Sequence, residues 1–129
     1  MLQFEQYASL KPFNTLNLNS RARYLATVST EQDLLDVLQS LTAQRLPVFI
    51  LSGGSNVLLS SYLDALVIRP VLKGIRLLVG TDANTVDPQQ VLVEVMAGEP
   101  WHAFVQYTLA QGWYGLENLA LIPGYVGAA

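Results

Sequence analysis

One turn constrains the fold of this chain more than any other stretch of its sequence. An apolar run at residues 47–51 leads directly into the polar, glycine-centred segment Ser52-Gly53-Gly54-Ser55-Asn56. A short apolar run bounded by proline and glycine is typical of a strand that is covered on both faces of a sheet. The turn would lie at the carboxyl end of that strand, where open α/β sheets usually bind ligands. The sequence therefore predicts a buried strand over 48–51 that ends in a ligand site.

The composition of this turn suits a phosphate. Paired glycines let the backbone adopt positive φ and approach a ligand closely, and successive N–H groups can converge on phosphate oxygens. Two familiar motifs are excluded, because the Walker loop ends in Gly-Lys-Ser/Thr and the dinucleotide fingerprint is G-x-G-x-x-G at the start of a helix. Residues 57–59 instead predict another short strand. The local sequence alone slightly favours a plain turn whose glycines serve only its geometry.

Composition limits the classes of partner. With 129 residues, 51% of them hydrophobic, the chain is about one domain long and can bury a sizeable core. A net charge of −3 without a Lys/Arg cluster predicts no nucleic-acid partner. The lack of cysteine excludes disulfides and thiolate metal sites. The sequence shows no signal peptide and no apolar run near the ~20 residues of a membrane span. We therefore expect a cytoplasmic protein with no membrane partner.

The first half of the chain alternates strand and helix patterns. Residues 24–28 predict a strand, and Thr30 can cap the helix that follows, with Asp33 completing a variant capping box. The helix has the length that a parallel crossover requires, so residues 24–51 predict one βαβ unit. Residues 66–68 predict a further strand.

The second half of the chain begins with a different pattern. Residues 75–79 and 91–96 predict two strands that form a hairpin with a long, mobile loop over 80–90. We therefore expect two subdomains, a first one over residues 1–72 and an incomplete second one over residues 73–129.

A helix with clear boundaries follows the hairpin. Pro100 fits its first helical position and Gly112 fits its C-terminal cap. One apolar face predicts that the helix packs into the core, and this face consists of Trp101, Phe104, Val105 and Leu109. His102 is the only histidine and has no second ligand at metal-binding spacing. We expect it neither to bind a metal nor to act as a catalytic base.

The last segment is a second glycine-rich stretch. Residues 112–129 read GWYGLENLALIPGYVGAA. Pro123-Gly124 is a turn pair, and Gly124 and Gly127 permit close backbone approach to a flat or anionic ligand. Taken alone, this stretch is equally typical of a surface loop.

Taken together, the two glycine-rich segments resemble the UDP-N-acetylenolpyruvoylglucosamine reductases, flavoenzymes of peptidoglycan precursor synthesis. The resemblance extends to residues 10–15 and 97–102, so it covers nearly the whole chain. It implies an α+β fold of the vanillyl-alcohol-oxidase (PCMH) type, in which two small α/β subdomains clamp FAD, here truncated at the C-terminus. Ser52 stands where relatives often carry glycine, and Tyr125 stands where they carry a small residue. These departures bear on flavin affinity rather than on the motif.

The resemblance also implies which residues bind the cofactor. In the family, the glycine turn holds the FAD pyrophosphate through backbone amides, and the Ile-Pro-Gly-x-x-Gly segment runs along the flavin side. The implied FAD-binding residues are Ser52, Gly53, Gly54, Ser55, Asn56, Val57, Gly98, Ile122, Pro123, Gly124 and Gly127. No metal-binding residue is implied.

The activity of the family is implied only for a longer protein. Complete members reduce UDP-N-acetylenolpyruvoylglucosamine to UDP-N-acetylmuramate, with hydride passing from NADPH through FAD. Their proton-donating serine, its partner glutamate and their substrate-binding residues lie further on than residue 129, so we expect an inactive fragment without catalytic residues. Glu117 lies in the matching motif, where we expect a packing or loop-fixing role. Two alternatives remain: a standalone nucleotide-binding or structural α+β module, and another PCMH-type flavin oxidoreductase.

Overall fold

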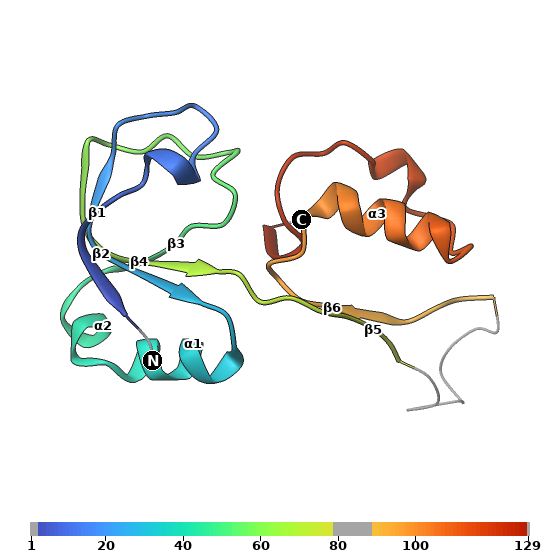
Figure 1. The fold of residues 1–129 in the computed structure, drawn as a ribbon, viewed down its shortest axis with the longest axis horizontal. Helices are drawn as coiled ribbons and strands as arrows, with labels where there is room; N and C mark the ends of the chain where they lie inside the picture. Colours follow the sequence, from blue (N-terminus) through green and yellow to red (C-terminus); the bar gives the residue numbers. More distant parts are fainter. Residues whose placement is uncertain (1–2, 79–88, 129) are drawn as a thin grey trace.

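The computed structural model describes residues 3–78 and 89–128, which form two lobes placed side by side (Figure 1). The first lobe, residues 3–70, contains a four-stranded sheet. Its strands are β1 (Phe4–Ser9), β2 (Arg21–Val28), β3 (Val48–Ile50) and β4 (Tyr62–Pro70). The strand order is β1-β2-β4-β3, in which β2, β4 and β3 are parallel and β1 pairs antiparallel to β2.

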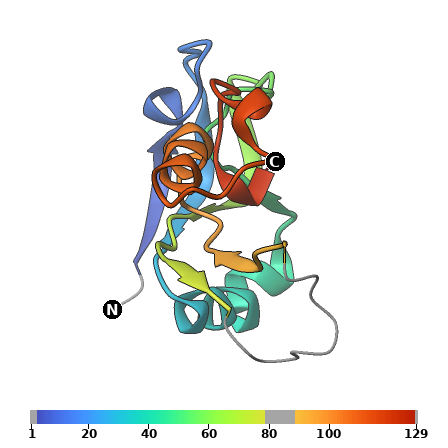
Figure 2. The same ribbon diagram turned by 90° about the vertical axis from the view of Figure 1, so that its right-hand side faces the viewer.

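The second lobe, residues 75–78 and 89–128, consists of an antiparallel hairpin with a helix beside it (Figures 1 and 2). Its elements are β5 (Ile75–Leu77), β6 (Val93–Val95), α3 (Trp101–Ala110) and the 3-10 turns η2 (Glu117–Leu119) and η3 (Val126–Ala128). The predicted hairpin is confirmed, with shorter strands than expected. The loop expected to be mobile lies largely outside the described residues. The expected subdomain boundary falls in the segment that links β4 to β5.

Two helices cover one face of the four-stranded sheet (Figure 1). They are α1 (Glu31–Gln39) and α2 (Leu41–Arg45). Successive side chains of a strand point to opposite faces, so Leu25 and Val67 belong to one buried cluster and Ala26 and Ile68 to the other. Val37 of α1 is fully buried in the second of these clusters. The helices therefore pack on the side of Ala26 and Ile68.

Loops cover the opposite face of this sheet (Figure 1). Leu10, Leu51 and Leu59 come from segments outside the strands and fill the buried cluster on this side. A 3-10 turn, η1 (Lys11–Phe13), follows the first of them. The glycine turn at residues 52–56 belongs to this loop layer, and the buried Leu51 anchors its start.

The start of α1 confirms the capping box predicted from the sequence. Thr30 Oγ1 accepts a hydrogen bond from the N–H of Asp33 at 3.0 Å, and the Asp33 carboxylate accepts one from the N–H of Thr30 at 3.1 Å. The N–H and hydroxyl of Ser29 also donate to this carboxylate, at 3.1 and 3.0 Å. The hydrogen bonds from Ser29, followed by those from Thr30, hold the pKa of Asp33 below its usual value.

The predicted βαβ unit is present, but its two strands are not neighbours in the sheet, because β4 lies between them. β2 and β3 are both parallel to β4, which separates them. β3 is consequently an edge strand, with Val48 41% and Ile50 57% exposed. The prediction that this strand is covered on both faces is therefore wrong. The nine-residue β4 pairs with both β2 and β3 and therefore lies inside the sheet.

The segment after the glycine turn is a loop, and the prediction of a strand at residues 57–59 is wrong. Leu58 is 84% exposed, whereas Leu59 is buried in the cluster on the loop-covered face. A single apolar side chain thus anchors this segment to the core without any strand pairing.

The helix α3 agrees with the sequence in position and differs in its buried face. Pro100 is the N-cap residue and precedes the first helical position, and Gly112 has φ +74° just beyond the C-terminal end. Phe104 and Val105 are buried as predicted, but Thr108 is the third buried residue, and Leu109 is 38% exposed. The buried face of the helix therefore consists of Phe104, its neighbour Val105 and Thr108, one helical turn after Phe104.

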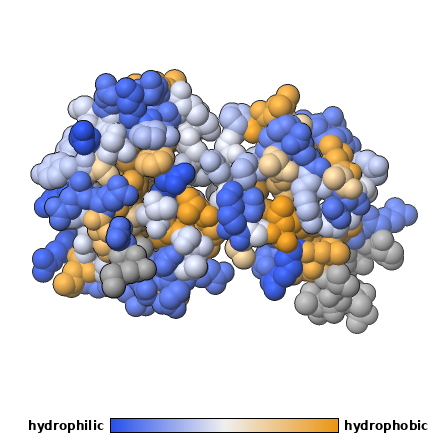
Figure 3. Space-filling model, viewed as in Figure 1, coloured by the Kyte–Doolittle hydropathy of each residue, from blue (hydrophilic) through white to orange (hydrophobic). Residues whose placement is uncertain are grey.

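The surface shows hydrophobic side chains where the two lobes face one another (Figure 3). Among residues 3–78 and 89–128, no helix combines the length and apolar character that crossing a bilayer requires.

Candidate cofactor-binding site

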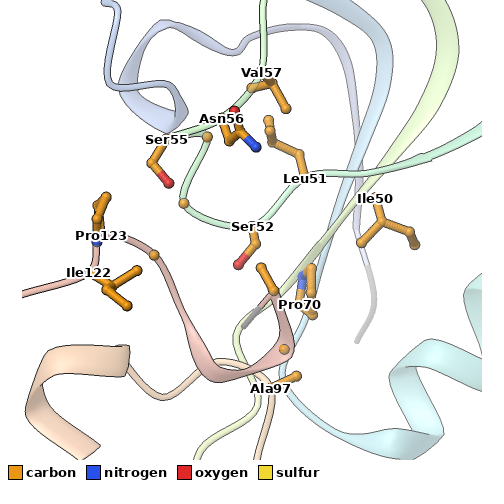
Figure 4. A pocket seen from close by; sticks show the side chains of 15 residues that line it. Ile50, Leu51, Ser52, Ser55, Asn56, Val57, Pro70, Ala97, Ile122 and Pro123 are labelled. Carbon is orange, nitrogen blue, oxygen red and sulfur yellow. The ribbon is translucent and has the colours of Figure 1, made fainter. Parts of the chain in front are cut away.

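A pocket of about 660 Å³ lies between the two lobes (Figure 4). It lies beyond the carboxyl ends of the parallel strands β3 and β4, which is the usual ligand position in open α/β sheets. The first lobe provides one wall and the second lobe the other. The lining residues are Ile50, Leu51, Ser52, Gly53, Gly54, Ser55, Asn56, Val57, Pro70, Ala97, Ile122, Pro123, Gly124, Gly127 and Ala128.

The first wall is the glycine turn, which residues 10–15 support from behind. The carbonyl oxygen of Gly54 accepts hydrogen bonds from the N–H and the hydroxyl of Thr15 at 3.1 and 3.3 Å. Gly54 has φ +64°, and a Cβ at this position would overlap the carbonyl oxygen of Phe13. Only glycine satisfies both conditions. The positive φ of Gly54 agrees with the sequence analysis. The absence of a side chain is required by packing against Phe13, a reason that the sequence did not suggest.

Asn14 holds the supporting segment in place. Its side chain is 6% exposed, and its Nδ2 donates to the carbonyl oxygens of Leu10 at 3.0 Å and Leu18 at 3.2 Å. Its Oδ1 accepts a hydrogen bond from the N–H of Leu18 at 2.8 Å. Sequence reasoning missed this role, although Asn14 lies within the segment 10–15 that contributes to the family resemblance.

The turn presents polar groups that have no hydrogen-bond partner among residues 3–78 and 89–128. Across the described part of the chain, no N–H of residues 52–57 donates to a protein acceptor. Ser52 Oγ is buried, has no hydrogen-bond partner and points into the pocket (Figure 4). Buried polar groups are nearly always paired, so a ligand rich in acceptors fits this wall. None of the lining residues is charged, so the attraction for an anion comes from amide and hydroxyl dipoles.

The second wall is the segment at residues 122–128, which is tied to the start of α3. The N–H of Trp101 donates to the carbonyl oxygen of Gly124 at 3.0 Å, and the N–H of Gly127 donates to that of Ala97 at 3.1 Å. A Cβ on Gly127 would lie 2.6 Å from the Cβ of Ala97. The two segments approach this closely because residue 127 is glycine.

Tyr125 connects the two walls. A Cβ on Gly53 would lie 2.9 Å from the Tyr125 ring, and a Cβ on Gly124 would lie 3.6 Å from Ser55 Oγ. The Nζ of Lys73 lies 5.8 Å from the centroid of the Tyr125 ring. The missing side chain at Gly53 therefore leaves the space into which this tyrosine packs.

Comparison with known proteins identifies the family. A family model described as "FAD binding domain" matches residues 22–129. The chain belongs to the FAD-binding domain family. The predicted α+β fold of FAD-binding type is confirmed by this match and by a solved structure that covers the whole chain.

The relatives of this FAD-binding domain confirm the resemblance found in the sequence. The UDP-N-acetylenolpyruvoylglucosamine reductase of Pseudomonas putida is 47% identical over 128 residues, which are 99% of this chain and 36% of the relative. The same reductase of Psychrobacter cryohalolentis is 47% identical, over 97% of this chain and 33% of the relative. The crystal structure of the reductase from Thermus caldophilus has a TM-score of 0.70 and 29% identity, and the match covers 100% of this chain and 41% of that chain. The chain thus spans about a third of the length of these curated relatives.

The FAD-binding domain brings nearly all of the predicted cofactor-binding residues to the pocket. The exception is Gly98, which does not line it. The N–H of Gly98 donates to the carbonyl oxygen of Leu72 at 2.9 Å, and a Cβ there would lie 2.5 Å from that oxygen. Close crossing with the segment after β4 explains this glycine, and its neighbour Ala97 lines the pocket instead. The lining residues that were not predicted are Ile50, Leu51, Pro70, Ala97 and Ala128.

Two polar side chains near the second wall have structural contacts. The Glu117 carboxylate accepts a hydrogen bond from the N–H of Gly115 at 2.6 Å, which confirms the expected loop-fixing role. Its own N–H and that of Gly115 hold the pKa of Glu117 below its usual value. His102 Nδ1 accepts a hydrogen bond from the N–H of Leu121 at 3.1 Å. Within residues 3–78 and 89–128, no group of three or more potential metal ligands gathers.

Proposed function

We propose that this domain binds FAD in the pocket between its lobes. We further propose that it serves a reductase that converts UDP-N-acetylenolpyruvoylglucosamine to UDP-N-acetylmuramate with NADPH. The observation that carries the proposal is the buried, unpaired hydroxyl of Ser52 beside the unpaired amides of residues 52–57. A pyrophosphate offers many acceptors and can satisfy these donors without a lysine. The family match and the names of the relatives support FAD as the ligand.

The two walls suit different parts of the cofactor. The donors of the turn suit pyrophosphate oxygens, and the apolar side chains of Ile122, Pro123 and Ala97 suit one side of a flat ring. The volume of about 660 Å³ lies within the range of small-molecule sites. The role of this chain is then to hold the cofactor in place and to shield part of it from water.

The chemistry itself belongs to the cofactor. When bound, FAD would act as the hydride carrier between NADPH and an enolpyruvyl double bond. The curated relatives are much longer than this chain. We propose that the groups that bind the UDP-sugar and donate the proton belong to the parts of such a reductase that these 129 residues do not match. Since UDP-sugar precursors and NADPH are cytoplasmic metabolites, we propose a cytoplasmic location.

Titration of the chain with FAD, followed through the flavin fluorescence, tests the proposal. The unaltered chain is expected to bind FAD saturably. Ser52→Ala removes a hydroxyl assigned to the pyrophosphate and is expected to weaken binding by about tenfold, because a hydrogen bond to a charged group is lost.

Ser20→Ala is the matched control, because Ser20 also carries a buried, unpaired hydroxyl but lines a different cavity. We expect its FAD affinity to equal that of the unaltered chain. Absence of saturable FAD binding would contradict the proposed function. Equal weakening in both variants would assign the effect of Ser52 to folding and remove it from the binding site.

A further inference from the structure

A smaller cavity with a polar lining, of about 280 Å³, lies at the other end of the first lobe's sheet. It lies where β1 ends and where β2 and β4 begin, whereas the FAD pocket lies beyond the carboxyl ends of β3 and β4. Its lining residues are Ser9, Asn19, Ser20, Arg21 and Ser61. The two cavities share no residue.

The lining of this cavity favours an anion. It consists of three serines, an asparagine and an arginine, and includes no carboxylate. Hydroxyl, carboxamide and guanidinium groups all donate hydrogen bonds, and arginine keeps its positive charge. A divalent cation usually takes carboxylate ligands, which the lining does not offer, and the positive charge of Arg21 opposes a cation. The chemistry therefore matches a small oxyanion.

The hydroxyl of Ser20 has no hydrogen-bond partner among the residues that the structure describes. The side chain is 1% exposed and its Oγ is unpaired. Its backbone is held in place, because its carbonyl oxygen accepts a hydrogen bond from the N–H of Leu10 at 2.9 Å. Of the other polar residues that are buried as a whole among the described residues, Asn14 and Thr108 both form hydrogen bonds. Two further buried atoms, Ser52 Oγ in the FAD pocket and Arg69 Nε, also lack a partner among the described residues. A buried hydroxyl of this kind needs a partner from outside the chain.

Arg21 contributes a positive charge that no carboxylate of the described residues neutralises. Its guanidinium donates to the carbonyl oxygen of Tyr7 at 2.8 Å, which directs the side chain along β1. Tyr7 has φ 51°, a strained conformation for a tyrosine, and this hydrogen bond helps to maintain it. Arg23, two residues further on, pairs with Asp64 at 3.0 Å. Arg21 forms no ion pair within residues 3–78 and 89–128.

We propose that this cavity binds a phosphate-type oxyanion, with the hydroxyls of Ser20 and Ser61 as donors and Arg21 as the source of charge. Such an anion completes the hydrogen bonding that the chain leaves open at Ser20. Guanidinium–phosphate hydrogen bonds are among the stronger polar contacts in proteins. The anion is either free phosphate or the phosphate group of a larger molecule. The site is independent of the proposed FAD binding.

Titration with inorganic phosphate, at an ionic strength held constant with sodium chloride, tests the inference through amide chemical shifts. Saturable shifts are expected at Ser20, Arg21 and Ser61. Arg21→Gln is expected to weaken binding by about tenfold, since a charged donor is lost. Ser20→Ala is expected to weaken it several-fold. Arg23→Gln is the matched control, because Arg23 lies outside the lining and should leave the affinity unchanged.

Titration with glycerol phosphate distinguishes the two sources of the anion. Tighter binding than that of inorganic phosphate assigns the site to a larger molecule, and equal binding assigns it to the free ion. Shifts that do not saturate would overturn the inference, as would a phosphate response that Ser20→Ala and Ser61→Ala both leave intact. Shifts confined to residues 52–57 would place the phosphate in the FAD pocket and would also overturn it.

Discussion

At the scale of single residues, the glycines of the site serve the packing of the protein as well as its ligand. A Cβ on Gly54 would overlap the backbone of Phe13, and a Cβ on Gly53 would lie 2.9 Å from the Tyr125 ring. Gly54 thus allows the segment that contains Phe13 to pack behind the turn, and Gly53 allows Tyr125 to approach the turn from the other wall of the pocket. A substitution meant to report on phosphate binding must leave these contacts intact, which Ser52→Ala does.

Gly54→Ala is expected to destabilise the chain strongly. The positive φ costs alanine about 1–2 kcal/mol, and the overlap with Phe13 adds about 1–3 kcal/mol of overpacking. Gly112→Ala is the matched control, because Gly112 also has positive φ but has no atom within 4 Å of its added Cβ. It should lose only the conformational contribution. Urea unfolding measures both, and equal losses would contradict the packing role of Gly54.

At the scale of elements, the start of α1 depends on a reciprocal cap. The side chains of Thr30 and Asp33 each accept a hydrogen bond from the backbone of the other residue. The two bonds satisfy donors that a helix start otherwise leaves unpaired. Since α1 covers the face of the sheet that contains Ala26 and Ile68, this local cap also sets where the helix begins against the core.

The cap predicts a pH dependence of stability. The folded state lowers the pKa of Asp33, so the contribution of this carboxylate is present above its unfolded pKa of about 3.9. It is lost as the pH falls through the lower, folded value. The free energy of unfolding of the unaltered chain, minus that of Asp33→Asn, should therefore shrink on acidification in urea titrations. Asp36→Asn, in the same helix and outside the cap, is the control. If the difference between the unaltered chain and Asp33→Asn stays constant with pH, the role of Asp33 in the cap is refuted.

At the scale of the whole molecule, the pocket exists only because both lobes contribute a wall. The turn at residues 52–57 comes from the first lobe, and the segment at 122–128 comes from the second. The close contact of Gly127 with Ala97 sets the position of the second wall. A ligand that contacts both walls stabilises the two lobes together.

FAD is therefore expected to raise the free energy of unfolding, by about 2.7 kcal/mol when free FAD is about 100-fold above its dissociation constant. Gly127→Ala should reduce this gain at the same FAD concentration, because a Cβ there pushes the second wall away from Ala97. Gly112→Ala should keep the full gain, since Gly112 lies outside the pocket. Urea unfolding with and without FAD measures the difference. An unchanged gain in Gly127→Ala would show that this wall does not contact the cofactor.

Much of the candidate site could be predicted because its residues are continuous in the sequence. The turn at 52–57 and the segment at 122–127 are each a single glycine-rich stretch, and both line the pocket. Pro70 and Ala97 could not be predicted, because they reach the pocket only where β4 ends and where the second lobe folds back. Nothing in the local sequence distinguishes them from other residues at the end of a strand.

The sequence by itself determined the features that depend on near neighbours, such as the cap at Thr30, the β5–β6 hairpin and the two glycine-rich segments. The tertiary structure alone decided that β4 separates β2 from β3 and leaves β3 exposed. It also decided that Asn14 supports the turn and that Gly98 packs against Leu72 outside the pocket. Each of these outcomes brings together segments that are distant in the chain. Their meeting depends on how the complete sheet and its covering layers bury apolar surface, which no local pattern specifies.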